Sequence, residues 1–385
     1  MEGRIPPFRY SFDAADIDRI TAEVRELLQA GAPLTMAGHG HALEARLCAH
    51  SRTRHAVAVA SGTAALEIIL RALHVHGGEV IVPTNTFGAT VVAALRAGAR
   101  PVFADASEDL SISVADAARK LTARTRAVIT VHIGGLISPH TVELAALCAA
   151  YDVPLVEDAA HAIGASLDGT MAGGFGAAAA FSLFSTKVIT SGEGGLIATN
   201  DDAIHHAALL LRDHAKDPDG AMVTTGYNWR LTEVQAIIAN AQLRRLDERI
   251  AQRNEVARVY DELLADAAGI SLLTPPRTVR HNRYKYVVFL QGRSPEPEAL
   301  RQALLDQFGI ELGGAVYRVP CHRQAAFKEF ARGGFPVADR LCGAHICPPI
   351  YPALTLEQAG YVANALKTIL ANSPHRSASS SWGEG

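Results

Sequence analysis

The stretch Phe181-Ser-Leu-Phe-Ser-Thr-Lys-Val-Ile-Thr-Ser-Gly-Glu-Gly-Gly195 places one lysine, Lys187, between small hydroxylated residues and a glycine-rich turn. The apolar residues 177–184 predict a strand before this turn, and residues 196–199 predict the next strand after it. Burial of a lysine at a strand end is expected to lower its pKa and raise its nucleophilicity. Such a lysine suits covalent catalysis through an imine, although a lysine considered alone is more often an exposed loop residue.

The composition of the 385-residue chain is that of a globular protein with room for two domains. Hydrophobic residues make up 49% and charged residues 19%, which argues against extensive disorder. The net charge of −3 gives no electrostatic case for binding nucleic acid or an anionic membrane. No apolar run has the length of a membrane span, and the N-terminal residues lack the order of a signal peptide. We therefore expect a cytoplasmic protein.

The five cysteines show no disulfide framework, because their number is odd and their spacing irregular. This favours reduced thiols in a cytoplasm. Cys342, His345 and Cys347 are close in sequence, but their spacing fits no common zinc motif. Buried structural cysteines are therefore favoured, and we expect no metal site.

Predicted strands and helices alternate from about residue 56 to the region of Lys187. With helices between them, the strands are expected at 56–60, 79–83, 100–105, 125–132 and 153–158. This alternation indicates an α/β fold with a mainly parallel sheet that is covered on both faces. Ligands bind such sheets at the carboxyl ends of the strands, where Phe87, Asp158 and Lys187 are predicted to lie.

The second half of the chain is predicted to complete the large domain and then to form a smaller α+β domain. Helices are expected at 203–213, 232–264, 296–308 and 355–370, and strands at 284–290 and 315–319. We assign residues 1–255, with an N-terminal helix, to the large domain and residues 256–372 to the small one. The Ser- and Gly-rich residues 373–385 are expected to form a disordered tail.

Four features together indicate one kind of site. Ser61-Gly-Thr63 opens a predicted helix directly after a strand, and such turns bind phosphate through backbone N–H groups, with Ser182 as a further donor. Phe87 could stack on a planar ring, and Asp158 could keep a ring nitrogen protonated. Taken alone, each feature is weak evidence, and for Asp158 and Phe87 a structural role is then the favoured interpretation. With Lys187 they form a phosphate cup, a stacking wall, an electron sink and a covalent anchor for pyridoxal phosphate (PLP).

The sequence resembles the DegT/StrS-type sugar aminotransferases, PLP enzymes of aspartate aminotransferase fold type I. The resemblance covers roughly residues 30–370 and implies a large domain with a mainly parallel seven-stranded sheet between helices, plus a smaller C-terminal domain. It rests on motifs that follow the family's order: Ser61-Gly-Thr-Ala-Ala-Leu66, Val82-Pro-Thr-Asn-Thr-Phe-Gly-Ala-Thr90, Gly98-Ala-Arg-Pro-Val-Phe-Ala-Asp105, Glu157-Asp-Ala-Ala-His161, Phe181-Ser-Leu-Phe-Ser-Thr-Lys187 with Gly192-Glu-Gly-Gly195, and Gly226-Tyr-Asn-Trp-Arg-Leu-Thr-Glu-Val-Gln235.

The resemblance implies a role for each matched residue. Lys187 would hold PLP as a Schiff base and transfer protons, Asp158 would bind the ring nitrogen, and Phe87 would stack on the ring. His161 would form a hydrogen bond near the cofactor's phenolic oxygen, where many members have Gln. Asn228 would reach the phosphate that is bound by a partner subunit. The phosphate of the same subunit would be held by Ser61, Gly62, Thr63 and Ser182.

Three further residues are candidates for substrate binding. The resemblance leaves Arg230 either a structural residue or a contact for a carboxylate or phosphate. Arg318 and His322 occupy the place of the family's substrate-facing loop, where they could meet a phosphate or a hydroxylated ring, or could be solvated. Residues 131–138 are smaller and more apolar than in many nucleotide-sugar members, which puts the usual sugar contacts in doubt.

The resemblance implies a PLP-dependent aminotransferase that acts as a homodimer with shared active sites. The donor would be an amino acid, Glu or Gln. The acceptor would be a keto group on a sugar, with a nucleotide-linked sugar favoured, or on a cyclitol. The reaction would follow a ping-pong scheme, in sugar or antibiotic biosynthesis.

Three alternatives remain open. A sugar dehydratase of the same fold is disfavoured because those enzymes replace the lysine with His. A non-catalytic PLP-binding regulator is disfavoured because Lys187, Asp158 and Ser182 are all present. A dinucleotide-binding oxidoreductase is disfavoured because no Gly-x-Gly-x-x-Gly follows the first predicted strand.

Overall fold

The computed structural model describes residues 4–10, 12–292 and 294–372, so the expected tail at 373–385 lies outside the described residues. The large domain is built on a seven-stranded sheet, in which β9 is antiparallel to its neighbours and the other strands are parallel. The predicted fold is therefore confirmed. The strand order is β1 (His55–Val59), β9 (Gly195–Thr199), β8 (Ala178–Ser182), β5 (Leu155–Asp158), β4 (Thr125–Val131), β2 (Glu79–Pro83) and β3 (Arg100–Ala104).

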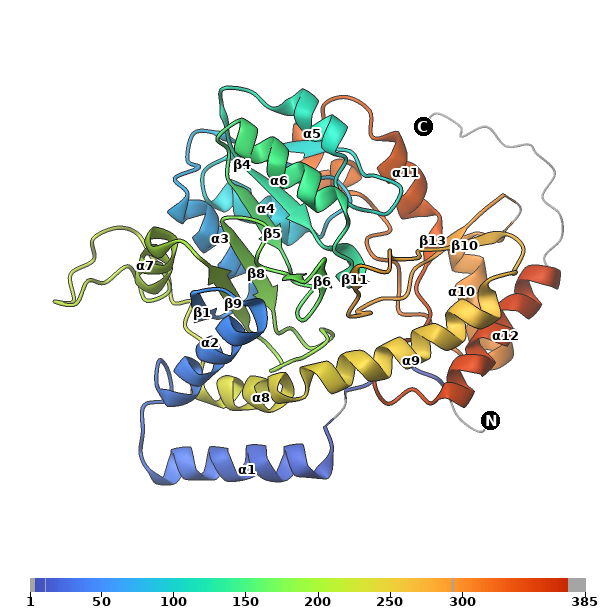
Figure 1. Cartoon of the computed structure of the whole chain (residues 1–385), viewed down its shortest axis with the longest axis horizontal. Helices are drawn as coiled ribbons and strands as arrows, with labels where there is room; N and C mark the ends of the chain where they lie inside the picture. Colours follow the sequence, from blue (N-terminus) through green and yellow to red (C-terminus); the bar gives the residue numbers. More distant parts are fainter. Residues whose placement is uncertain (1–3, 11, 293, 373–385) are drawn as a thin grey trace.

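Helices cover both faces of this sheet (Figure 1). One face packs against α3 (Gly62–Ala72), α4 (Gly88–Arg96) and α7 (Asp202–Leu211). The other face packs against α2 (Gly38–Ser51), α5 (Val114–Lys120), α6 (His140–Ala150) and α8 (Glu233–Arg244). Val57 and Val59 of β1 face the first layer, whereas Ala56 and Ala58 face the second, because successive side chains of a strand point to opposite faces.

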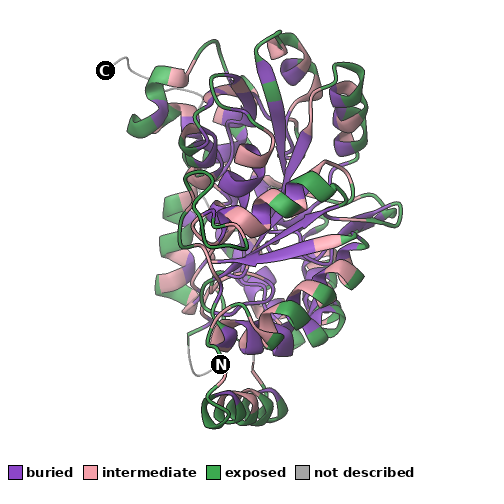
Figure 2. Cartoon of the chain, turned by 90° about the vertical axis from the view of Figure 1, so that its left-hand side faces the viewer, coloured by how far each residue is buried: buried purple, intermediate pink, exposed green. Residues whose placement is uncertain are grey.

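The N-terminal helix α1 (Ala14–Gln29) lies apart from this body, next to α8. Only Asp16 and Leu27 of α1 are buried, and Figure 2 shows the helix at the bottom as largely exposed. In the same view the central sheet is almost entirely buried. No helix among the described residues combines the length and the apolar character needed to cross a membrane.

Helix α8 begins with a capping box between Thr232 and Gln235, and α9 (Leu246–Leu264) follows it directly. Ile250 of α9 belongs to a core of the large domain, whereas Val256 belongs to the core of the small domain. The boundary after residue 255 therefore falls within one continuous helix. We keep it as a proposal that matches the change of core.

The small domain contains a three-stranded antiparallel sheet of β10 (Ile270–Leu272), β12 (Val288–Leu290) and β13 (His345–Ile346). Ile5 joins its core and pairs with Ile310, so the N-terminal segment lies against the small domain. Its helices are α10 (Pro297–Phe308), α11 (Pro336–Gly343) and α12 (Leu356–Asn372), and it contains the short 3₁₀ turns η2 (Cys321–Arg323) and η3 (Ala325–Phe330). A further 3₁₀ turn, η1 (Ile133–Gly135), follows β4 in the large domain.

Of two strands predicted in this region, one is only partly confirmed and the other is wrong. Only the end of the segment 284–290 forms a strand, because the N–H of Lys285 is bonded to Gly134 O of the large domain instead of a strand neighbour. Residues 315–319 form none, since the Val316 N–H is bonded to a histidine side chain and Tyr317 has a φ of +83°. The short sheet of β6 (Ser166–Leu167), β7 (Thr170–Met171) and β11 (Val279–Arg280) was not expected.

Candidate active site

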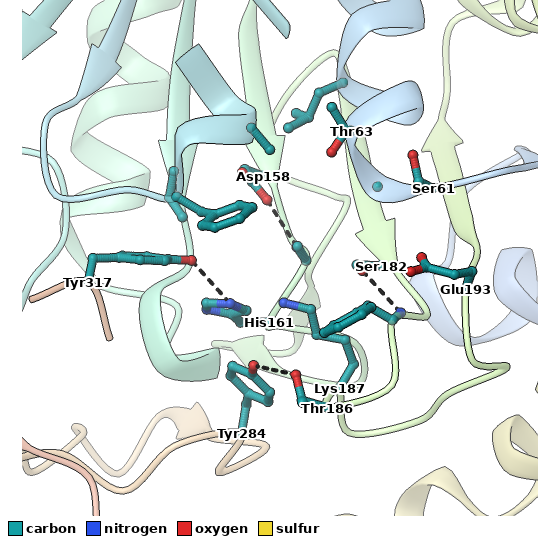
Figure 3. Close-up of a pocket in the computed structure, with 17 residues that line it drawn as sticks. Ser61, Thr63, Asp158, His161, Ser182, Thr186, Lys187, Glu193, Tyr284 and Tyr317 are labelled. Carbon is teal, nitrogen blue, oxygen red and sulfur yellow. Dashed lines mark hydrogen bonds between the residues drawn. The ribbon is translucent and has the colours of Figure 1, made fainter. Parts of the chain in front are cut away.

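A cavity of about 370 Å³ lies at the carboxyl ends of β5 and β8 (Figure 3). It contains eight of the residues that the sequence predicted to bind a cofactor. These are Ser61, Gly62, Thr63, Phe87, Asp158, His161, Ser182 and Lys187. The remaining lining residues are Leu66, Ala89, Val131, Ala160, Phe184, Thr186, Glu193, Tyr284 and Tyr317. Segments far apart in sequence thus meet around one lysine.

Lys187 projects into this cavity from the turn that follows β8. Its backbone N–H donates to Phe184 O over 2.9 Å, and its Nζ lies 5.0 Å from the ring centre of Tyr284. Burial lowers the pKa of Lys187 from 10.5 to about 8, with Asp158 opposing this shift. A substantial fraction of the amine is therefore neutral at slightly alkaline pH, as a nucleophile requires.

Two adjacent carboxylates at the end of β5 serve different purposes. Glu157 points away from the cavity, where it accepts hydrogen bonds from Gly173, Phe175 and Gly176 N–H groups. Asp158 faces the cavity, as successive residues of a strand must point to opposite sides.

The direct hydrogen-bond partners of Asp158 are uncharged groups. Thr90 Oγ1 donates to Asp158 Oδ2 over 2.7 Å, and the Ala160 N–H donates to Oδ1 over 3.2 Å. Burial nevertheless raises the pKa of Asp158, although both hydrogen bonds oppose this change. A protonated pyridine nitrogen would provide the positive charge that the buried carboxylate lacks among these direct partners.

The predicted phosphate site lies at the N-terminus of α3. Ser61 caps this helix by accepting a hydrogen bond from Ala64 N over 3.1 Å, and the positive end of the helix favours an anion. Gly62 lies so close to β8 that an added Cβ would be 3.1 Å from Ser182 Cβ. Backbone N–H groups and the Ser182 hydroxyl can therefore reach one ligand group.

Phe87 and the tyrosines supply the aromatic walls. Phe87 is 63% exposed, which excludes the alternative of a core aromatic, and its ring centre lies 6.2 Å from that of Tyr317. His161 lies between two tyrosines, with centroid distances of 4.3 Å to Tyr284 and 6.0 Å to Tyr317. No role was predicted for Tyr284, Tyr317 or Glu193. The two tyrosines lie about a hundred residues or more beyond Lys187, where no local spacing connects them to it, whereas Glu193 belongs to the same glycine-rich motif as Lys187.

The cavity fits PLP by the chemistry of its lining. It offers an amine of lowered pKa, a buried carboxylate, exposed aromatic rings and an anion site at a helix N-terminus. These four groups correspond to the aldehyde, ring nitrogen, ring face and phosphate of the cofactor. The fold and the site therefore assign this protein to the class of fold type I PLP enzymes.

Comparisons with known proteins identify the family. The model of the DegT/DnrJ/EryC1/StrS aminotransferase family matches residues 15–367. The chain belongs to this family, and it is a PLP-dependent aminotransferase.

Three similar proteins illustrate the range of the family. A pleiotropic regulatory protein of Geobacillus stearothermophilus is 35% identical over 84% of this chain and 87% of its own length. UDP-N-acetyl-3-dehydro-alpha-D-glucosamine 3-aminotransferase of Acidithiobacillus ferrooxidans is 34% identical over 92% of this chain and 94% of its own. The PLP form of Spr1654 from Streptococcus pneumoniae, described as a sugar aminotransferase, has a TM-score of 0.88, 25% identity and coverage of 96% and 100%.

Four predicted residues lie outside the cavity of a single chain. Asn228 is exposed, and Arg230 forms an ion pair with Asp213. Arg318 is exposed and pairs with Glu298 over 3.0 Å. The His322 ring contacts Thr84 Oγ1 at 2.7 Å and Asp339 Oδ1 at 3.0 Å. Their roles in cofactor or substrate binding stay predictions. The contacts of Arg230, Arg318 and His322 show structural uses for each in the isolated chain.

Proposed function

We propose that this aminotransferase moves an amino group from an amino acid, Glu or Gln, to a keto group of a nucleotide-linked sugar or a cyclitol. The observation that carries the proposal is the placement of Lys187 and Asp158 on one cavity beside a phosphate cup. The Acidithiobacillus relative, which by its name acts on a UDP-linked keto sugar, supports the acceptor class.

The residues of the cavity would have separate roles in this reaction. Bound PLP would supply a carbonyl that reacts with amines and a ring that withdraws electrons from the substrate carbon. Lys187 would hold the cofactor and then, as a free amine, move a proton between the substrate's α-carbon and the cofactor's C4′. Asp158 would keep the ring nitrogen protonated, and the α3 N-terminus with Ser182 would anchor the phosphate.

We also propose a homodimer whose sites need both subunits. Among the described residues that line the cavity there is one lysine and no arginine, yet an amino-acid donor brings at least one carboxylate. A cationic side chain that binds the donor's carboxylate therefore has to come from outside the residues that line this cavity. Residues 216–225 extend away from the body beside α7 (Figure 1), and Met222 and Val223 on this segment are exposed, as is Tyr227 just after it. Exposed apolar side chains close in sequence to the exposed Asn228 suit contact with a second copy.

Complementation between two inactive variants tests the shared site. A mixture of co-expressed Lys187→Ala and Asn228→Ala chains should be more active than either variant alone, because one site of each mixed dimer is then intact. Light scattering on the wild type should give the mass of a dimer. A fully active monomer would refute the proposal.

Steady-state kinetics test the reaction itself. When an amino donor and a keto-sugar acceptor are varied together, double-reciprocal plots of the initial rate should give parallel lines, since the first product leaves before the acceptor binds. Intersecting lines would contradict the two-step scheme. The Geobacillus relative named as a regulator makes a non-catalytic role the second candidate. That role would be favoured if the protein binds PLP but no amino donor changes its absorption spectrum.

The free cysteines support the proposed cytoplasmic setting. All five are unpaired, and Cys148, Cys321, Cys342 and Cys347 are buried. Reduced thiols are typical of a reducing compartment. His345 between the last two is used structurally, because its ring bonds to Val316 N and Leu341 O.

A further inference from the structure

The hydrogen bonds around His161 determine which ring nitrogen carries its proton. The backbone N–H of Gly134 donates to Nδ1 of His161 over 3.3 Å. A nitrogen that accepts a hydrogen bond carries no proton, so a neutral ring must hold its proton on Nε2. Burial lowers the pKa of His161 well below its usual value, and the charges of Lys187 and Lys285 act in the same direction. The ring is therefore neutral near pH 7.

The Gly134 N–H, which donates to this ring, is held in place by backbone contacts. Gly134 lies in the turn η1 with a φ of +64°, and its carbonyl accepts from the Lys285 N–H over 3.0 Å. The Asn282 side chain donates to His161 O over 2.7 Å and so holds the histidine, which is the acceptor of the Gly134 hydrogen bond. The tautomer of His161 is thus imposed by segments that meet only in the tertiary structure.

The proton on Nε2 points to Tyr317. The Tyr317 hydroxyl oxygen lies 3.2 Å from His161 Nε2, so it accepts this hydrogen bond (Figure 3). Its own hydrogen is then free to donate elsewhere. Among the described residues the Tyr317 hydroxyl has no other hydrogen-bond partner, and the side chain lines the cavity. The free O–H is therefore available to a ligand in the cavity.

The backbone holds Tyr317 in an unusual conformation. Its φ of +83° is rare for a residue with a bulky side chain, and such strain persists only where the surroundings enforce it. Two hydrogen bonds anchor the loop. Before Tyr317, the Val316 N–H donates to His345 Nε2 over 2.8 Å, and after it the Cys321 N–H donates to Thr84 O over 2.7 Å.

The surroundings also keep this phenol protonated. Burial raises the pKa of Tyr317 well above its usual value, and the neighbouring titratable groups Asp158, Tyr284 and Cys321 act in the same direction. Tyr317 is therefore a hydrogen-bond donor throughout the physiological pH range.

We propose that Tyr317, oriented by His161, donates its hydroxyl hydrogen to the phenolic oxygen of bound PLP. The family resemblance assigns this contact to position 161. In this chain the only proton of the His161 ring is already used in the bond to Tyr317, so the contact is made by the tyrosine instead. Tyr317 is then a cofactor-binding residue and His161 a positioning residue. The proposal rests on the assignment of this cavity as the PLP site.

The pH dependence of the cofactor's visible absorption tests this contact. In Tyr317→Phe the phenolic oxygen loses a donor and becomes more basic, so it retains a shared proton to higher pH. The midpoint of the absorption change should rise by about one pH unit. Tyr284→Phe is the matched control, because its hydroxyl bonds to Thr186 at 3.3 Å and not to His161. A midpoint in Tyr317→Phe equal to the wild-type value would overturn the proposal.

A measurement on the cofactor-free wild type tests the orientation separately. ¹⁵N NMR should show His161 neutral at pH 7 with its proton on Nε2, the signal being assigned by its loss in His161→Gln. A protonated Nδ1 would refute the arrangement. Failure of the PLP-site assignment would look different, because wild-type protein would then show no cofactor absorption that depends on Lys187, whereas the NMR result would be unaffected.

Discussion

Lys187→Ala is expected to lower the transamination rate by about 10⁴-fold, because the substitution removes both the covalent anchor and the base that moves the proton. The visible absorption of purified protein with added PLP provides the direct measurement. Wild-type protein should form a bound-cofactor band that bleaches when L-glutamate is added. The variant should form no such band and should not respond to the amino acid.

Lys285→Met is the matched control for this substitution. Lys285 is also a partly buried lysine, but its Nζ donates to Gly313 O over 3.0 Å and it does not line the cavity. The control should retain the cofactor band. Loss of the band in both variants, or its retention in Lys187→Ala, would contradict the assignment of Lys187.

The pH dependence of cofactor capture gives a second signature of the same lysine. Only the neutral amine attacks the aldehyde, and burial lowers the pKa of Lys187 to about 8. At pH 6 the neutral fraction is only about one per cent, so capture by the cofactor-free protein should accelerate up to about pH 8 and then level off. A rate that keeps rising toward pH 10 would indicate a solvated lysine instead.

Asp158→Asn should give the second largest loss, roughly 200-fold to 5,000-fold in turnover. Removing one member of a buried charge pair costs roughly 3–5 kcal/mol, and here the pair would be the carboxylate and the protonated ring nitrogen. A neutral amide cannot stabilise that positive charge, so the ring becomes a poorer electron sink. Stopped-flow absorption after mixing with the amino donor would measure the rate of the first half-reaction directly.

Glu157→Gln separates this electronic role from a structural one. Glu157 is the preceding residue of the same strand, is also buried, and pairs with His132 over 2.9 Å on the opposite side. Its loss should lower the melting temperature while the cofactor spectrum of the folded protein stays normal. If Asp158→Asn lost only stability and kept its half-reaction rate, the assignment of the ring-nitrogen partner would be wrong.

Local patterns were sufficient for most of the fold. The alternation of apolar strands and amphipathic helices predicted the parallel sheet, and the six motifs predicted the phosphate turn, the carboxylate and the lysine. The same reasoning failed at residues 284–287 and 315–319, where apolar spacing resembles a strand. There the backbone bonds to Gly134 O and to a histidine side chain, partners that no local pattern can reveal.

The amino-acid sequence alone determined the class of the protein, because local periodicity and short motifs encode strands, helix caps and the residues of the PLP chemistry. The tertiary structure alone decided which side chains share the cavity. It brought Tyr284 and Tyr317 to His161 across more than a hundred residues of chain and gave the histidine one tautomer. Such contacts depend on packing between distant segments, and their geometry is set by the whole fold rather than by any neighbouring residue.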